Sequence, residues 1–155
     1  MSAIPLTGKG RVTLNLAMLI NMLSIGSTMM VMPLAADLAA PLNMPPQYAG
    51  YIAGLAGLAA ALASWLAAPW LDRFARRPLL VALAALRFAA LAGCAAVQSS
   101  TQLIWLFALS GVFAGPMGAT LMAAIVDMTP AAQRGRQLAY VAMGFSLAGI
   151  AVVPL

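Results

Sequence analysis

The stretch that decides the fold is PWLDRFARRPLL, residues 69–80, a short charged segment between two long apolar stretches. Its charged residues are Asp72, Arg73, Arg76 and Arg77. Apolar residues fill about 48–70 before it and about 78–97 after it. About 20 apolar residues are enough for one membrane-spanning helix. The segment therefore predicts a tight hairpin between two membrane helices, with its charges at the membrane surface.

The remainder of the chain has the same apolar character. Of its 155 residues, 64% are hydrophobic and only 7% are charged, and the mean hydropathy is +0.98. Soluble domains carry about 25% charged residues, so this composition excludes them and predicts lipid as the main solvent. We expect five spans, at about 12–35, 48–70, 78–97, 103–126 and 138–155. The fold class is an all-α polytopic bundle, because helices pair their own backbone groups in lipid and the alternating pattern of membrane strands is missing.

The basic residues fix the orientation of these spans. Seven of them flank the spans on one side: Lys9, Arg11, Arg73, Arg76, Arg77, Arg134 and Arg136. The predicted loops after the first and third spans hold neither Lys nor Arg. By the positive-inside rule, the N-terminus is cytoplasmic in a multi-pass protein of the cell (inner) membrane. Topology also accounts for the net charge of +5, so we expect no nucleic-acid partner.

The residues that most enzymes use for catalysis are scarce. The chain has no His and no Glu, and its acids are Asp37, Asp72 and Asp127. A lone Cys94 permits neither a disulfide framework nor a thiol metal site. We therefore expect no catalytic residues, no metal and no cofactor.

The charged segment resembles a known loop. Asp72, Arg73, Arg76, Arg77 and Leu80 fill the acidic, basic and final Leu places of Gly-x-Leu-Ala-Asp-Arg-x-Gly-Arg-Lys-x-x-Leu, the signature of the major facilitator superfamily. Ala68 and Ala75 stand at its Gly positions, and Trp70 takes its Leu place. Residues 127–136, DMTPAAQRGR, are similar to the family's connection between spans four and five, and residues 32–38, MPLAADL, to its first-span exit.

The resemblance implies a function and a set of site residues. It implies a solute transporter in which two six-helix bundles rock about a midplane site. It also implies a cytoplasmic conformational latch made by Asp72, Arg73, Arg76, Arg77, Asp127 and Arg134. Gly144 and Pro154 have the separation found in the fifth span of the family's antiporters, although Val153 replaces a Gly there. This last match favours the efflux branch.

Arg87 stands near the middle of the third predicted span, roughly 15 Å from either end of the helix. An Arg at that depth costs about 2.5–3.5 kcal/mol on insertion scales, so it usually faces a cavity or a partner. One interpretation is a contact to an anionic solute or to a coupling group. The other interpretation is that the guanidinium hydrogen-bonds backbone carbonyls or sits beside water in a local defect of the bilayer.

A polar stripe lies in the first predicted span. Asn21, Ser24 and Thr28 fall within about 60° of one another on the helix. Such a stripe either lines a cavity or bonds a neighbouring helix. The resemblance favours contact with the substrate, a small molecule, and both readings stay open.

Small residues form two ridges, Gly50, Gly54, Gly57 and Ala61 in the second predicted span and Gly111, Gly115 and Gly118 in the fourth. Glycines at this spacing let helix backbones approach closely in lipid. We predict helix packing at both ridges, and a bend at Pro116 beside the second.

The leading hypothesis is therefore a secondary-active efflux transporter. Since the family uses twelve spans, we expect this chain to hold one bundle without its last helix, and to need a C-terminal bundle from the same or another chain. The alternative is a non-transporting membrane interaction protein or a half-module that needs a partner chain.

Overall fold

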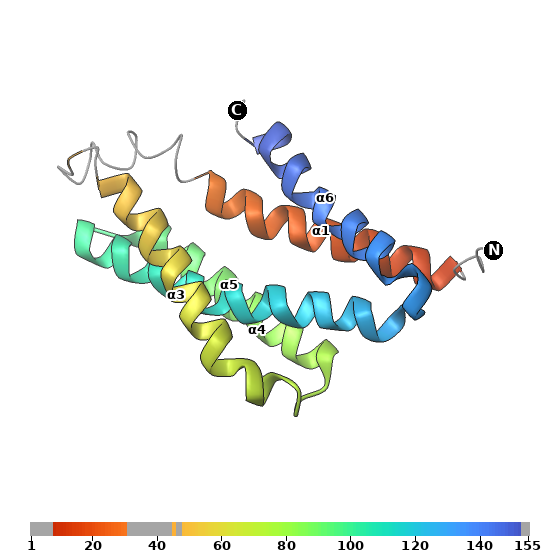
Figure 1. Cartoon of the computed structure of the whole chain (residues 1–155). Helices are drawn as coiled ribbons and strands as arrows, with labels where there is room; N and C mark the ends of the chain where they lie inside the picture. The colour runs from red at the N-terminus through yellow and green to blue at the C-terminus, as the bar shows by residue number, and fades with distance from the viewer. Residues whose placement is uncertain (1–7, 31–44, 46–47, 153–155) are drawn as a thin grey trace. The chain divides into compact units, whose positions relative to one another are not determined.

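The computed structural model describes residues 8–30, 45 and 48–152. The predicted first-span exit at 32–38, with Asp37, lies outside the described residues, and so does Pro154. Within the described ranges the chain forms five α-helices and no strand (Figure 1). The helices are α1 (Gly8–Met29), α3 (Tyr48–Leu71), α4 (Arg76–Gly93), α5 (Ser100–Met128) and α6 (Arg134–Val152). The prediction of an all-α fold is confirmed.

The helices begin slightly before the apolar stretches do. Helices α4, α5 and α6 start at Arg76, Ser100 and Arg134, two to four residues ahead of the predicted spans. Hydropathy counts only the residues that favour lipid, whereas the first turn of a helix is often polar and capped. At α5 the Ser99 hydroxyl accepts the backbone N–H of Gln102 at 3.3 Å, and the Gln102 side chain accepts the N–H of Gln98 at 3.3 Å. This reciprocal pair resembles a capping box and fixes where α5 starts.

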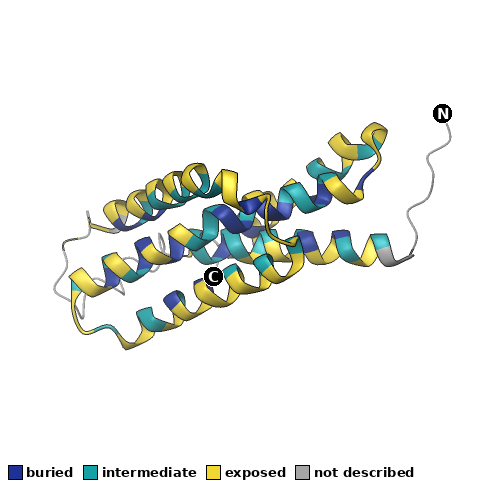
Figure 2. Cartoon of the chain, turned by 90° about the horizontal axis from the view of Figure 1, so that it is seen from below, coloured by how far each residue is buried: buried dark blue, intermediate teal, exposed yellow. Residues whose placement is uncertain are grey.

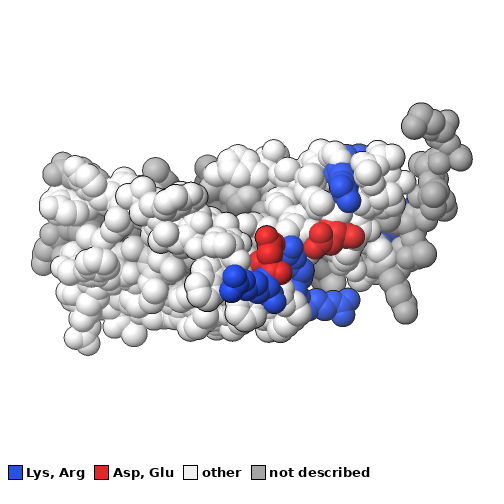
Figure 3. Space-filling view, turned by 60° about the horizontal axis from the view of Figure 1, so that its bottom comes forward, with Lys and Arg blue, Asp and Glu red and all other residues white. Residues whose placement is uncertain are grey.

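Among residues 8–30 and 48–152, four helical segments are long and apolar enough to cross a membrane. They are Gly10–Met29, Gly50–Leu71, Arg76–Ala96 and Ser100–Met128. Helix α6 is not among them, so a fifth span at 138–155 remains a prediction. Large apolar side chains such as Trp65 and Phe88 are exposed, each to 74%. Exposed residues run along the helices in Figure 2, and most of the surface seen in Figure 3 is uncharged. A surface of this kind belongs against hydrocarbon rather than water.

The chain divides into two compact units. The terminal unit consists of Met1–Met29 and Ala124–Leu155, with α1, α6 and the end of α5. The central unit is Met30–Ala123, with α3, α4 and most of α5. Helix α6 packs against α1 in the first unit, and α5 packs against α3 in the second.

In the central unit, α5 approaches α3 through two glycines. A β-carbon on Gly111 would overlap the carbonyl oxygen of Ala56, and one on Gly115 would overlap the carbonyl oxygen of Ala60. Beside this contact lies a small core of buried residues: Ile52, Ala56, Leu103 and Phe107. The two backbones therefore lie so close that a residue with a β-carbon would not fit at Gly111 or Gly115 on the α5 side.

The other predicted ridge positions do not make this contact. A β-carbon on Gly50, Gly54, Gly57 or Gly118 would meet no atom within 4 Å among the described residues. Helix α3 uses the face of Ala56 and Ala60 against α5, and not its glycine face. That the ridge of Gly50, Gly54 and Gly57 packs against another helix remains a prediction.

Candidate functional site

The hairpin between α3 and α4 is closed by backbone hydrogen bonds. After Leu71 the N–H of Arg73 donates to the carbonyl of Trp70 at 3.0 Å. Ala75 then has an extended backbone, with φ −62° and ψ 129°, and α4 begins at the next residue. This short turn brings the charged side chains of residues 72–77 to one end of the central unit.

Asp72 and Arg76 form an ion pair in this hairpin. Nη2 of Arg76 donates to Oδ1 of Asp72 at 3.0 Å, and Nη1 donates to the carbonyl of Leu71 at 3.4 Å. A cation on the last carbonyls of α3 also complements the helix dipole. The Asp72 side chain is 76% exposed, so the pair contributes at most about 1 kcal/mol to stability.

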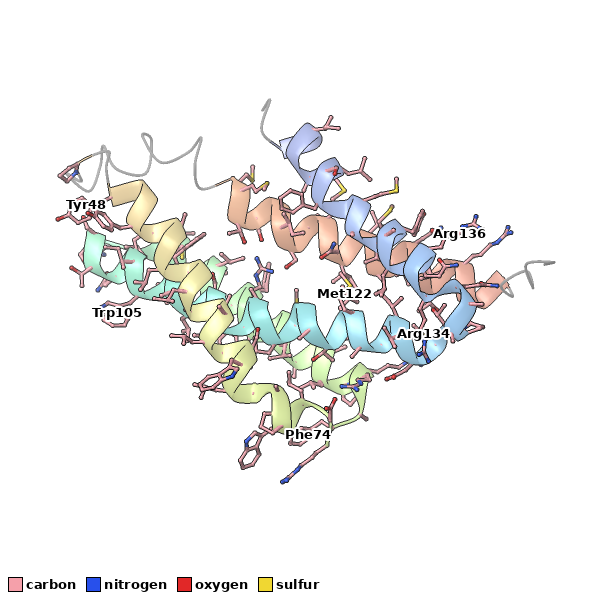
Figure 4. The ribbon with its side chains drawn as sticks, in the orientation of Figure 1. Tyr48, Phe74, Trp105, Met122, Arg134 and Arg136 are labelled. Atoms are coloured by element: carbon pink, nitrogen blue, oxygen red, sulfur yellow. The ribbon has the colours of Figure 1, made fainter. Side chains whose placement is uncertain are left out.

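The remaining residues of the predicted latch lie in different surroundings. The exposed Arg73 places its guanidinium carbon 5.5 Å from the centroid of the Trp70 ring, and Arg77 is exposed. Asp127 and Arg134 belong to the terminal unit, where Nε of Arg134 donates to the carbonyl of Thr129 at 3.2 Å. Arg134 therefore braces the connection between α5 and α6 (Figure 4). Pairing of Asp127 with the hairpin remains a prediction.

Arg87 is buried within α4. It is 5% exposed, and it is the only buried charged side chain among the described residues. It lies near the middle of the candidate span Arg76–Ala96, on the same face as the buried Ala90. A fixed positive charge at this depth is costly, and a partner of opposite charge or a set of acceptors offsets that cost.

The polar stripe on α1 serves partly as a contact to α6. Nδ2 of Asn21 donates to the carbonyl of Val141 at 2.9 Å. The hydroxyls of Ser27 and Thr28 donate to the carbonyl of Ser24, at 2.8 and 3.3 Å. Asn21 therefore bonds to a neighbouring helix, which is one of the two interpretations of this stripe.

Two contacts between α1 and α6 were not predicted as such. The Tyr140 hydroxyl donates to Oδ1 of Asn15 at 2.8 Å. A β-carbon on Gly144 would lie 2.9 Å from the carbonyl oxygen of Met18 and 3.1 Å from the N of Met22. Helix α6 thus passes close to the backbone of α1 at Gly144. Asn15 and Tyr140 each stand out in the sequence as a polar residue in an apolar span. Their pairing could not be predicted, because one sequence does not show which spans are neighbours.

The central unit also has an apolar groove between α3 and α5. Its volume is about 450 Å³, and the described residues that line it are Leu, Ala, Val and Trp from 55–62 and 105–112. The indole of Trp105 carries the sole polar side-chain atom in this lining. The groove offers little to a polar solute, so we do not assign the transport site to it.

Replacing Asn21 by Ala tests the contact between α1 and α6. We expect the free energy of unfolding of the full-length protein to fall by about 0.6–1.7 kcal/mol, the range measured for hydrogen bonds between membrane helices. Thermal unfolding in detergent measures this loss. Ser146→Ala removes an exposed hydroxyl of α6 and serves as the control. An unfolding midpoint of Asn21→Ala equal to that of the control would contradict a stabilising bond to Val141.

The family is decided by comparison with known proteins. Residues 16–155 match the family model described as Major Facilitator Superfamily. The chain belongs to the major facilitator superfamily. No curated protein and no solved structure matches it. Members of the superfamily are membrane transporters and not enzymes, so this chain is a multi-pass membrane protein whose function is solute transport across the bilayer.

Proposed function

We propose that this superfamily member is a secondary-active transporter that exports a small solute by alternating access, with Arg87 as the central contact. Alternating access requires a second bundle, in the same chain or another, that rocks against this one around a midplane site. The observation that carries the proposal is the burial of Arg87 in the middle of an apolar span.

The charge of Arg87 indicates the class of solute. In a low-dielectric span a guanidinium is compensated best by an anion, either a carboxylate or phosphate on the solute or an acidic coupling group. We propose an anionic solute. Ser24 and Thr28 are proposed as further contacts, to hydrogen-bond donors elsewhere on the solute in the case of Thr28, whose hydroxyl already donates to the carbonyl of Ser24 and keeps its oxygen as an acceptor. Asn21 is proposed to hold α1 against α6.

The orientation and direction of transport belong to the same proposal. The basic residues of the predicted loops favour a cytoplasmic N-terminus in the inner membrane. The match of Gly144 to the antiporter pattern favours export. In that orientation the hairpin of Asp72, Arg73, Arg76 and Arg77 acts at the cytoplasmic end, where with Asp127 and Arg134 it would hold one state of the cycle.

Flux in proteoliposomes tests the proposal. Full-length protein would be reconstituted into proteoliposomes, and labelled anions, cations and neutral solutes would be placed either inside or outside the vesicles. A proton gradient of either sign would be imposed. We expect flux of an anion that depends on the gradient and runs outward in the native orientation. If no solute class moved in either direction, the transporter proposal would fail, and movement of cations alone would reject the role of Arg87.

The latch predicts the behaviour of Asp72→Asn. Because the pair with Arg76 is largely exposed and contributes at most about 1 kcal/mol, we expect transport to slow by about two- to five-fold while the unfolding midpoint falls only slightly. Initial rates in proteoliposomes measure the effect. The charge-swapped variant Asp72→Arg with Arg76→Asp should recover part of the lost rate. Normal transport by Asp72→Asn would remove the latch.

A further inference from the structure

Four side chains at the α3–α4 hairpin lie outside the Asp72–Arg76 ion pair. We call this set the hairpin tip: Trp70, Arg73, Phe74 and Arg77. We propose that the hairpin tip binds the headgroups of anionic phospholipids at the membrane surface. This goes beyond the proposed transport function, because it requires neither a solute nor a transport cycle.

The aromatic residues of the tip are exposed where the span ends. Trp70, in the last turn of α3, is 61% exposed, and Phe74, in the turn that follows, is 59% exposed. Figure 4 shows Phe74 at this hairpin. The candidate span ends at Leu71, so both rings stand at the level where hydrocarbon gives way to headgroups. Trp is enriched at this level because its ring is apolar while its N–H can still reach polar groups.

The charges of the tip complement an anionic headgroup. Arg76 is engaged with Asp72 and with the Leu71 carbonyl, so the positive charge of this guanidinium is already balanced by a carboxylate. Arg73 and Arg77 are both exposed, and they leave the hairpin with a net charge of +2. A phosphate can accept hydrogen bonds from such a guanidinium fork.

The position of Arg73 joins the two features. Its guanidinium carbon lies 5.5 Å from the centroid of the Trp70 ring, within range of a cation–π interaction. A ring at the hydrocarbon boundary thereby holds the cation beside the phosphates. A water-soluble acidic partner would also be attracted to Arg73 and Arg77, but it would give no reason for Trp70 and Phe74 to be exposed beside them.

The experiment measures lipid contact at Trp70 directly. In the full-length protein with Trp65→Phe and Trp105→Phe, Trp70 is the only Trp left within the 155 residues, and any Trp outside them is replaced likewise. Nanodiscs of phosphatidylcholine would contain an equal mole fraction of brominated phosphatidylglycerol or brominated phosphatidylcholine. Quenching of Trp70 reports which lipid lies against the tip, and because both leaflets are identical the result does not depend on orientation.

We expect the brominated anionic lipid to quench Trp70 more strongly than the brominated phosphatidylcholine does. At low salt this preference for the anionic lipid should fall by about five-fold for each arginine that is removed. Arg73→Gln with Arg77→Gln should abolish the preference, whereas Arg73→Lys with Arg77→Lys should retain most of it. Arg11→Gln with Arg136→Gln removes the same charge from exposed positions of the terminal unit and should leave it unchanged. Equal quenching by the two lipids, or an equal loss in the Arg11 and Arg136 control, would overturn the proposal.

Discussion

Replacing Arg87 by Ala is expected to reduce transport by at least about 30-fold while the protein remains folded. Truncating one member of a buried, hydrogen-bonded charge pair costs about 2–5 kcal/mol in binding, which corresponds to this factor or more. Removal of the charge also removes an insertion cost of about 2.5–3.5 kcal/mol, so the unfolding midpoint should stay level or rise. Flux and thermal unfolding would be measured on the same full-length preparation.

Two further variants separate the roles that Arg87 could have. Arg87→Lys keeps the charge but loses the planar fork, so we expect transport between those of the native protein and the Ala variant. Phe88→Leu changes the adjacent, highly exposed residue of α4 and should transport normally. If Arg87→Ala lowers flux and the unfolding midpoint together, and Arg87→Lys restores both, the residue stabilises the bundle and does not contact the solute.

The second large effect is expected where α5 crosses α3. In Gly111→Ala and Gly115→Ala the new β-carbon would overlap a backbone carbonyl of α3, and a backbone cannot move aside as a flexible side chain can. Overpacking of this kind costs about 1–3 kcal/mol, and we expect the unfolding midpoint of the full-length protein to fall by about 2–12 °C. Loss of folded protein during heating in detergent measures the shift.

Helix α5 contains its own control for this experiment. Gly118 is also a glycine and lies one turn further on, but a β-carbon there would meet nothing within 4 Å in the part of the chain that the structure describes. Gly118→Ala should be neutral or slightly stabilising, because Ala favours a helix more than Gly does. If all three variants behaved alike, helix propensity would explain the result, and the close crossing of α3 and α5 would be wrong.

The local features of the site could be read from the sequence. Asp72 and Arg76 are four residues apart, and their pairing depends only on the course of one short turn. The mid-span position of Arg87 follows from counting residues along one apolar stretch. The capped start of α5 likewise depends on residues 98–102 alone. Each feature needs information from only a few neighbouring residues.

The contacts between helices could not be read in the same way. In a soluble protein the apolar face of a helix shows which side is buried, but in lipid both sides are apolar and the pattern loses this information. The sequence therefore offered glycine ridges on α3 and α5 as equal candidates. In the structure Gly111 and Gly115 touch α3, whereas β-carbons on Gly50, Gly54 and Gly57 would meet no atom of the described residues within 4 Å.

The sequence by itself determined that this protein is a helical membrane protein with a charged hairpin and one Arg deep in a span, since composition, helix length and residue spacing are local properties. Only the tertiary structure decided that Asn21 bonds the carbonyl of Val141, that Gly144 lies against α1, and which face of α3 meets α5. These contacts join residues up to 126 positions apart, as with Met18 and Gly144. They depend on which backbones fit together closely, and no single helix carries that information.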